Sequence, residues 1–283
     1  MGFYRFSHYV LITKFGIMDS YREYFPTKSF RLAEMRLAML LSKERDRLDC
    51  IAKDLGREHA IGPDNLCEQL PYILEFTKSY HQAYAEYLKA VLPQQPRPVQ
   101  CRPACGNCCH HYPMSVEPFE LIYLYSEIRG RSDLLDVMEA CQLRASMFES
   151  FYEKRCEEHL KNVSDDLSQS KRVDDDFDDR AEDEALHDYF SAWKPCMFSD
   201  KVGDCSVYPY RPVSCRMYFS ETEPAFCTPE FLQTEQNDSY VVYLPDSAED
   251  AVYGISEHYA PLDLPESFFA GLLAVNGFEG VIG

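Results

Sequence analysis

Eight of the twelve cysteines in this chain fall into two groups whose spacing suits metal binding. Four of them lie within nine residues in a C-x3-C-x2-C-C pattern, and four more follow at intervals of nine, ten and twelve residues. Thiolates are common ligands of structural zinc and of iron–sulfur clusters, and each such centre takes four. The sequence therefore predicts metal ligation by Cys101, Cys105, Cys108, Cys109, Cys196, Cys205, Cys215 and Cys227.

Eight thiolates suffice for two four-cysteine sites, or for one cluster and a second ion. The adjacent Cys108 and Cys109 would not readily share one small zinc site, because successive side chains diverge, which leaves open that they serve neighbouring centres. We favour an iron–sulfur cluster, of the 4Fe-4S kind, over zinc, because eight thiolates with an adjacent pair exceed the needs of one structural zinc. Gly106 within the first group relaxes the backbone so that thiolates can converge.

A disulfide framework is the alternative reading of the same cysteines. The opening twenty residues lack a small-residue cleavage site after an apolar core, so no secretory signal is expected. We therefore expect a cytoplasmic, reducing location, where clustered cysteines more often hold metal than disulfides.

Basic and imidazole side chains adjoin the cysteines in sequence. Arg102, Arg211 and Arg216 could offset part of the negative charge of a thiolate site, and we expect them to surround the metal rather than to catalyse. His110 and His111 could ligate metal, donate to a sulfur, or orient the loop.

The remaining cysteines sit singly in or beside helical patterns. Free cysteine behaves as a small hydrophobe and is among the most buried residue types. We therefore predict a structural, buried role for Cys50, Cys67, Cys141 and Cys156.

Composition excludes several classes of function. The chain has 283 residues, with 28 Lys and Arg against 47 Asp and Glu, which gives a net charge of −19. Such a surface would repel a phosphate backbone, so no nucleic-acid partner is expected. No apolar run is long enough for a membrane span, and no glycine-rich nucleotide loop is present.

The elements that must position the cysteines are mostly helices. Apolar periodicity predicts helices over residues 29–55 and 70–92, the second with a buried tyrosine stripe, and over residues 116–128 and 133–161. In the first helix the expected core face comprises Leu32, Met35, Met39, Leu48, Ile51 and Leu55. The proline-rich residues 93–100 break the second helix and predict a boundary there.

The second half of the chain carries fewer periodic signals. Over residues 165–188 acidic side chains outnumber basic ones by 11 to three, which predicts a solvated, mobile insertion. Residues 193–227 have no regular period, and the tail offers a strand over residues 240–244 and a short helix over residues 267–275.

We therefore predict a mainly α fold, with helices around an irregular cysteine-rich centre and a minor β element near the C-terminus. The expected division is a helical N-terminal region, residues 1–97, a cysteine-cluster domain, residues 98–235, with the acidic insertion 164–188, and a C-terminal segment, residues 236–283, packed on the core.

The cysteine segments resemble the bacterial YkgJ-type cysteine-cluster family, a zinc- or iron-chelating domain with the signature C-x-x-C-x-x-C-C. The likeness continues in G-D-C-S-V-Y-P-Y-R-P-V-S-C-R, residues 203–216, and covers roughly residues 98–230. This chain departs from the pattern by having three residues, rather than two, between Cys101 and Cys105. The resemblance implies metal binding by the eight cysteines, without an assigned reaction.

A distant likeness to flagellin lysine N-methylases supplies an alternative function. It implies a protein-lysine N-methyltransferase that uses S-adenosylmethionine, with a protein substrate or partner that the acidic insertion could attract. Calorimetric titration with S-adenosylmethionine would separate this hypothesis from a purely structural or redox metal site, because only the methyltransferase predicts binding.

Overall fold

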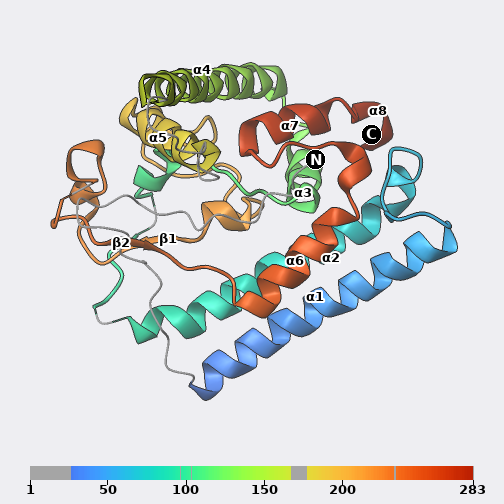
Figure 1. The fold of residues 1–283 in the computed structure, drawn as a ribbon. Helices are drawn as coiled ribbons and strands as arrows, with labels where there is room; N and C mark the ends of the chain where they lie inside the picture. Colours follow the sequence, from blue (N-terminus) through green and yellow to red (C-terminus); the bar gives the residue numbers. More distant parts are fainter. Residues whose placement is uncertain (1–26, 96, 103, 167–176, 233, 283) are drawn as a thin grey trace.

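The computed structural model confirms a mainly helical fold with one small two-stranded sheet (Figure 1). It describes residues 27–95, 97–102, 104–166, 177–232 and 234–282. The longer helices are α1 (Lys28–Asp54), α2 (Leu66–Val91), α3 (Pro118–Ile128), α4 (Leu134–Asp166), α5 (Phe177–Ser191), α6 (Asp246–Glu257) and α7 (Phe268–Asn276), and the last is the short α8 (Glu279–Ile282).

Helix α1 forms where periodicity predicts it, but part of the expected face is wrong. Leu37, Leu41 and Leu48 are fully buried against α2 and α6, whereas four of the residues expected in the core are exposed: Leu32, Met35, Met39 and Leu55. The true core face also carries Ala33, Glu44 and Ala52. Glu44 is buried there because Arg47 donates to its carboxylate at 2.6 Å.

Helix α2 buries its tyrosines, as the stripe predicts. Tyr80, Tyr84 and Tyr87 are all at least 97 % buried. The Tyr84 hydroxyl donates to the Val242 carbonyl oxygen at 2.8 Å, which joins α2 to the C-terminal part of the chain. Core packing therefore accounts for this stripe.

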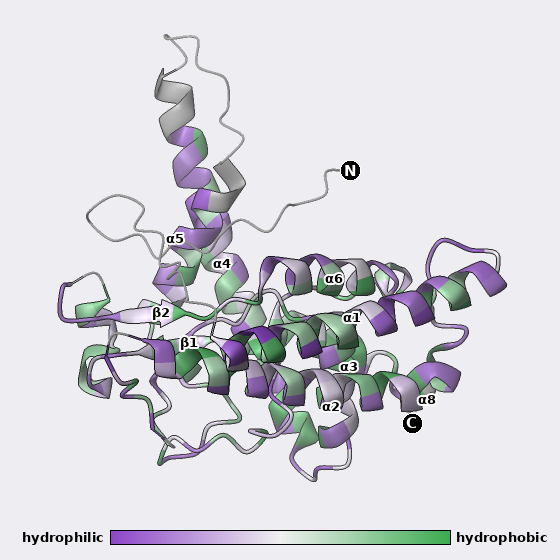
Figure 2. Cartoon of the chain, turned by 90° about the horizontal axis from the view of Figure 1, so that it is seen from below, coloured by the Kyte–Doolittle hydropathy of each residue, from purple (hydrophilic) through white to green (hydrophobic). Residues whose placement is uncertain are grey.

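Helices α4 and α5 pack side by side and stand away from the layer of α1, α2 and α6 (Figure 2). Residues 177–188 of the acidic stretch are helical, and because Ala181 and Ala185 are buried, the expectation of a solvated segment is wrong for residues 181–188. Four side chains of this helix are buried and form an apolar face: Ala181, Ala185, Tyr189 and Phe190. Arg155 of α4 forms an ion pair with Asp188 at 2.7 Å. Residues 167–176 of the predicted insertion lie outside the described residues.

The C-terminal segment lies against the helices that precede it. Helix α6 packs on α1, and α7 packs on α3 and α4. Two backbone hydrogen bonds, from Val116 to Glu266 at 2.8 Å and from Phe268 to Pro113 at 2.9 Å, tie the start of α7 to the segment before α3. This contact places α7 beside the residues that follow the first cysteine group.

The sheet contains the strand that the tail predicts. Strand β1 (Tyr218–Ser220) pairs antiparallel with β2 (Ser239–Val241), with Phe219 opposite Tyr240. Because β1 follows Cys215 by only three residues, the sheet anchors one end of the second cysteine group.

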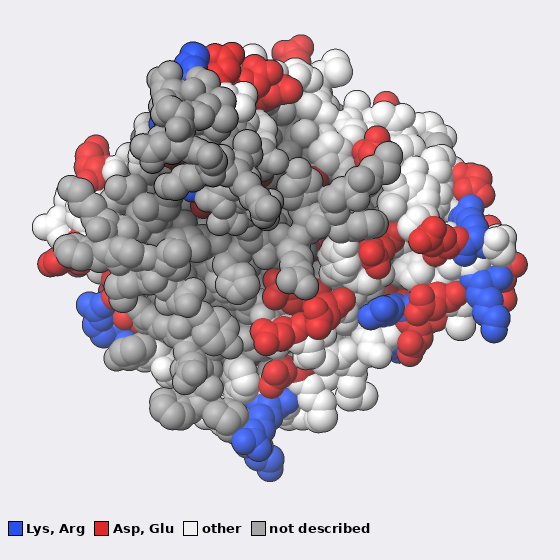
Figure 3. Space-filling model, in the orientation of Figure 1, with Lys and Arg blue, Asp and Glu red and all other residues white. Residues whose placement is uncertain are grey.

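Acidic side chains cover more of the described surface in Figure 3 than basic ones, as the net charge of −19 requires. Within the described ranges, no helix combines the length and the apolar character that a membrane crossing needs.

Candidate metal centre

The two cysteine groups, far apart in sequence, meet in the fold. The Cys196 N–H donates to the Cys109 carbonyl oxygen at 2.9 Å, and the Asn107 side-chain amide donates to the Pro224 carbonyl oxygen at 2.5 Å. At the edge of the sheet, the Gln100 N–H donates to the Ser220 carbonyl oxygen at 2.8 Å. These hydrogen bonds bring residues 100–109 and 196–224 together.

Two glycines lie where the two cysteine loops approach one another. Gly106 and Gly203 both have positive φ, of 67° and 91°, which disfavours any residue with a side chain. A Cβ at Gly203 would lie 2.5 Å from the Ala104 carbonyl oxygen, and a Cβ at Gly106 would lie 3.1 Å from the Gly203 Cα. The two loops can touch here only because neither position carries a side chain.

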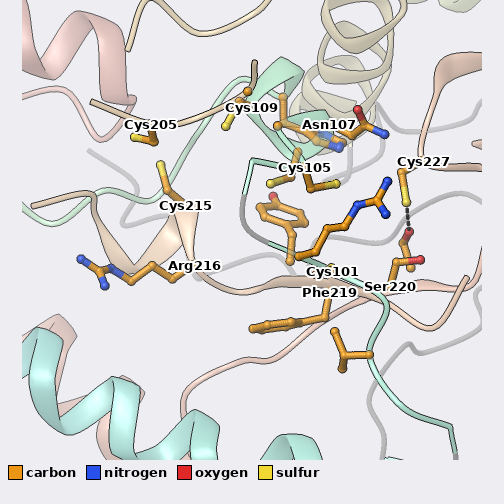
Figure 4. A pocket seen from close by; sticks show the side chains of 18 of the residues that line it. Cys101, Cys105, Asn107, Cys109, Cys205, Cys215, Arg216, Phe219, Ser220 and Cys227 are labelled. Atoms are coloured by element: carbon orange, nitrogen blue, oxygen red, sulfur yellow. Dashed lines mark hydrogen bonds between the residues drawn. The ribbon is translucent and has the colours of Figure 1, made fainter. Parts of the chain in front are cut away.

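The predicted ligands line two adjoining cavities. The larger, of about 750 Å³, is lined by all eight cysteines except Cys196. The smaller, of about 40 Å³, is lined by Cys108, Cys109, Cys196, Cys205 and Cys215. On one side of the larger cavity Cys205 and Cys215 lie next to one another, and Cys227 lies on the other side (Figure 4).

The donor chemistry of this place fits zinc or an iron–sulfur cluster, because soft sulfur ligands predominate around both cavities. In the part of the chain that the structure describes, no three His, Cys, Asp or Glu side chains are arranged so that they could hold a metal ion as they stand. The sulfurs would therefore have to move inward to close a coordination shell.

Burial favours the protonated form of several thiols of the candidate centre. Burial raises the pKa of Cys101 to about 11 and that of Cys196 to about 12. The hydrogen bond that the Cys108 thiol makes to Cys109, and then burial, raise the pKa of Cys108, and burial raises the pKa of Cys215. Protonated thiols neither repel one another nor bind metal, so any metal that binds here must displace their protons.

Two of the three arginines beside the cysteines, Arg211 and Arg216, lie in different environments in the fold. The Arg211 guanidinium lies 4.0 Å from the centre of the Tyr208 ring, and its positive charge acts to lower the pKa of Cys108, Cys205 and Cys215. Its buried Nε has no hydrogen-bond partner among the described residues. Arg211 is therefore placed to offset thiolate charge, as its position in sequence predicts.

Arg216 holds the loop together from within. Its guanidinium donates to the carbonyl oxygens of Arg211 at 2.7 Å and Pro209 at 2.9 Å. Burial and the positive charge of Arg211 lower its pKa. These bonds fold residues 208–216 into a compact turn that carries Cys215 on its surface toward the cavities.

The two histidines lie in aromatic stacks. His110 stacks on Trp193 with ring centres 3.8 Å apart, and His111 lies between Phe190, at 4.1 Å, and Tyr218, at 5.2 Å. Burial lowers the pKa of His111 to about 4, so this imidazole stays neutral at physiological pH. His111 borders both cavities.

The prediction that all four single cysteines are buried is wrong. Cys141 is fully buried in α4, whereas Cys50 and Cys67 are exposed and Cys156 is half-buried. Cys50 lies on α1 and Cys67 at the start of α2, on helix sides that face outward because other residues fill the interface between these helices.

Sequence reasoning also missed residues that support the candidate centre. Glu120, in the first turn of α3, accepts a hydrogen bond from the Val213 N–H at 2.8 Å and is bonded to His81 of α2 at 2.7 Å. Nothing in the sequence spacing of Glu120 or His81 distinguishes them. The sequence gives only a weak indication that Gly203 approaches Gly106, namely that each glycine lies beside cysteines. Only the fold shows that the two glycines lie against one another.

Comparisons with family models, curated proteins and solved structures return no match to this chain. The functional argument therefore depends on the cysteines and on the contacts that bring them together.

Proposed function

We propose that this protein binds metal, as an iron–sulfur cluster or as zinc, through its eight clustered cysteines in a structural or redox role. The observation that carries the proposal is the convergence of two cysteine groups, about ninety residues apart in sequence, on two adjoining cavities. Eight thiols gathered without a disulfide in a chain that has a large helical core are typical of metal ligation.

The arrangement of the cavities favours two centres over one. Cys101, Cys105 and Cys227 border only the larger cavity, and Cys196 borders only the smaller. Cys108 and Cys109 border both cavities; because the Cys109 carbonyl oxygen accepts from the Cys196 N–H, we assign Cys109 to the smaller centre with Cys196, and its neighbour Cys108 to the larger. The proposed sets are Cys101, Cys105, Cys108 and Cys227 for one centre, and Cys109, Cys196, Cys205 and Cys215 for the other.

When bound, the metal would supply cross-links between the two loops and, if it is a cluster, an electron-transfer centre. The chain's own residues would hold the ligands: the backbone bond between Cys196 and Cys109 aligns the two loops, and Arg211 offsets the thiolate charge.

Anaerobic purification followed by metal analysis tests the proposal directly. We expect the protein to contain either iron with acid-labile sulfide and absorption near 400 nm, or zinc without that absorption. A protein that folds fully without metal, and that takes up neither Zn²⁺ nor iron and sulfide under reducing conditions, would reject the proposed function.

Proton release on metal binding gives a second, quantitative prediction. A free cysteine thiol is already mostly protonated at pH 7, and burial raises the pKa of Cys101 and Cys196 further, so a Zn²⁺ ion bound by four thiolates at pH 7 should release about four protons. Affinity should consequently rise as pH rises toward the thiol pKa. Titration of the reduced protein with Zn²⁺ in a weakly buffered indicator solution measures the released protons, and release of fewer than about two protons per ion would contradict four-thiolate binding.

A further inference from the structure

A buried carboxylate in the helical body reaches the loop that carries Cys215. Glu120 of α3 is only 1 % exposed, and its Oε1 accepts two hydrogen bonds. One comes from the Val213 N–H at 2.8 Å, and the other joins it to His81 Nε2 of α2 at 2.7 Å. A single oxygen atom therefore links two helices to the cysteine-rich centre.

Burying a carboxylate lowers the stability of the fold, because the carboxylate loses its hydration. The presence of Glu120 at this position therefore calls for a compensating role. Its second oxygen, Oε2, has no hydrogen-bond partner among the described residues, and neither has Nδ1 of the buried His81. An apolar side chain at position 120 would avoid the cost of burying these polar atoms. An apolar side chain could not, however, accept the hydrogen bond from the Val213 N–H.

The bond to Val213 is made at the point where it can fix a candidate ligand. Val213 begins the 3-10 helix Val213–Cys215, and Cys215, two residues later, borders both cavities. Arg216 ties the rest of this loop to itself through the carbonyl oxygens of Arg211 and Pro209. The internal bonds make the turn rigid, and the bond to Glu120 sets where that rigid turn lies relative to the helices.

We propose that Glu120, held by His81, is a positioning residue for the metal centre: it fixes the turn of residues 211–216 so that Cys215 faces the cavities. The inference rests on the proposed function, because it concerns the ligand that Cys215 would supply. It adds that α2 and α3, which contribute no cysteine ligand, take part in forming the centre.

The test measures Co²⁺ binding to the reduced protein, because thiolate-bound cobalt has charge-transfer absorption that reports both affinity and the geometry of the sulfurs. Glu120→Ala removes the acceptor. Val213→Pro removes the donor instead, and Pro212 already has the extended ψ of 161° that a following proline requires. Because outer hydrogen-bond partners of metal ligands typically contribute 10- to 100-fold to affinity, we expect both variants to bind Co²⁺ about 10- to 100-fold more weakly, with altered absorption.

Two controls separate positioning from general stability. Glu120→Gln keeps an acceptor oxygen and should restore affinity and absorption close to those of the wild type. Glu117→Ala removes another carboxylate from the start of the same helix, where burial raises its pKa to about 8 and Ser256 donates to it, but which makes no bond to the cysteine loop. It should leave Co²⁺ binding unchanged even if it alters the free energy of unfolding.

Wild-type affinity and absorption in both Glu120→Ala and Val213→Pro would overturn the inference while leaving metal binding intact. So would an equal loss in Glu117→Ala, or a loss in Glu120→Ala that Val213→Pro does not reproduce. If Glu120→Ala does not fold, Val213→Pro with Glu120→Gln decides the question. Absence of Co²⁺ binding in the wild type would instead reject the proposed function.

Discussion

Cys215→Ser is expected to abolish metal binding at the smaller centre while leaving the larger one loaded. Cys215 borders both cavities and lies next to Cys205 on one side of the larger (Figure 4). A hydroxyl is a poor ligand for zinc or iron in a thiolate site, because it keeps its proton at neutral pH and is a hard donor. Since loss of a mere outer partner costs about 10- to 100-fold, loss of a ligand should cost more than about 100-fold in affinity.

The measurement is the metal content per chain after anaerobic purification, together with thermal unfolding of the loaded and metal-free forms. Metal content should fall to about half, and the loaded variant should unfold at a lower temperature than the loaded wild type because bound metal stabilises only the folded state. Cys141→Ser is the control for loss of a thiol, since Cys141 is fully buried in α4 and borders neither cavity, whereas Cys215 is half-buried. A full complement of metal in Cys215→Ser would exclude this cysteine as a ligand.

The helices could be predicted from sequence because their apolar residues recur with helical period over many turns. The face that α1 buries could not be predicted, because it depends on the helices that pack against it, α2 and α6. Ala33 and Ala52 are small enough for these helices to approach closely, and Glu44 is buried in the interface, where its ion-pair partner is Arg47. Large side chains such as Met35 and Met39 fit the same period and are nevertheless exposed. The helical period alone is compatible with either face of α1 being buried, and the size and charge of the side chains at the interface determine which face is buried.

Helix α5 could not be predicted from sequence, because the acidic composition of its segment indicates a solvated stretch rather than a packed helix. Its acidic residues predict solvation, but the helix also carries a buried side with Ala185 and Tyr189, and it packs against α4. Arg155 supplies the countercharge that makes this packing favourable, through Asp188 at 2.7 Å and Glu184 at 3.3 Å. A charge count along the chain cannot register a cation that comes from another helix.

For the candidate centre, sequence predicts the side chains but not what holds them. Cysteine spacing singles out the eight residues, and the arginines beside them follow from simple charge compensation. The contact between Gly106 and Gly203, and the bond from Val213 to Glu120, join residues some ninety positions apart. Local patterns carry no information about such pairs, because each partner looks ordinary in its own segment.

Gly203→Ala is expected to destabilise the protein and to separate the two cysteine loops. The added Cβ would lie 2.5 Å from the Ala104 carbonyl oxygen, an atom of the backbone that cannot move without shifting Cys105. The positive φ of 91° adds the strain of left-handed backbone, which costs about 1–2 kcal/mol for a residue with a side chain. Together the two effects should lower the free energy of unfolding by about 3 kcal/mol and reduce metal uptake, because the loops that present Cys105 and Cys205 would no longer meet.

Gly56→Ala isolates the contribution of the contact. Gly56, at the end of α1, has a similar positive φ of 64°, but an added Cβ there would meet nothing within 4 Å. It should therefore show only the backbone cost of about 1–2 kcal/mol and bind metal as the wild type does. Chemical unfolding and Zn²⁺ uptake of the two variants, measured side by side, give the difference. Equal losses of stability and unchanged metal uptake in both variants would mean that the approach of Gly203 to residues 104–106 does not hold the centre together.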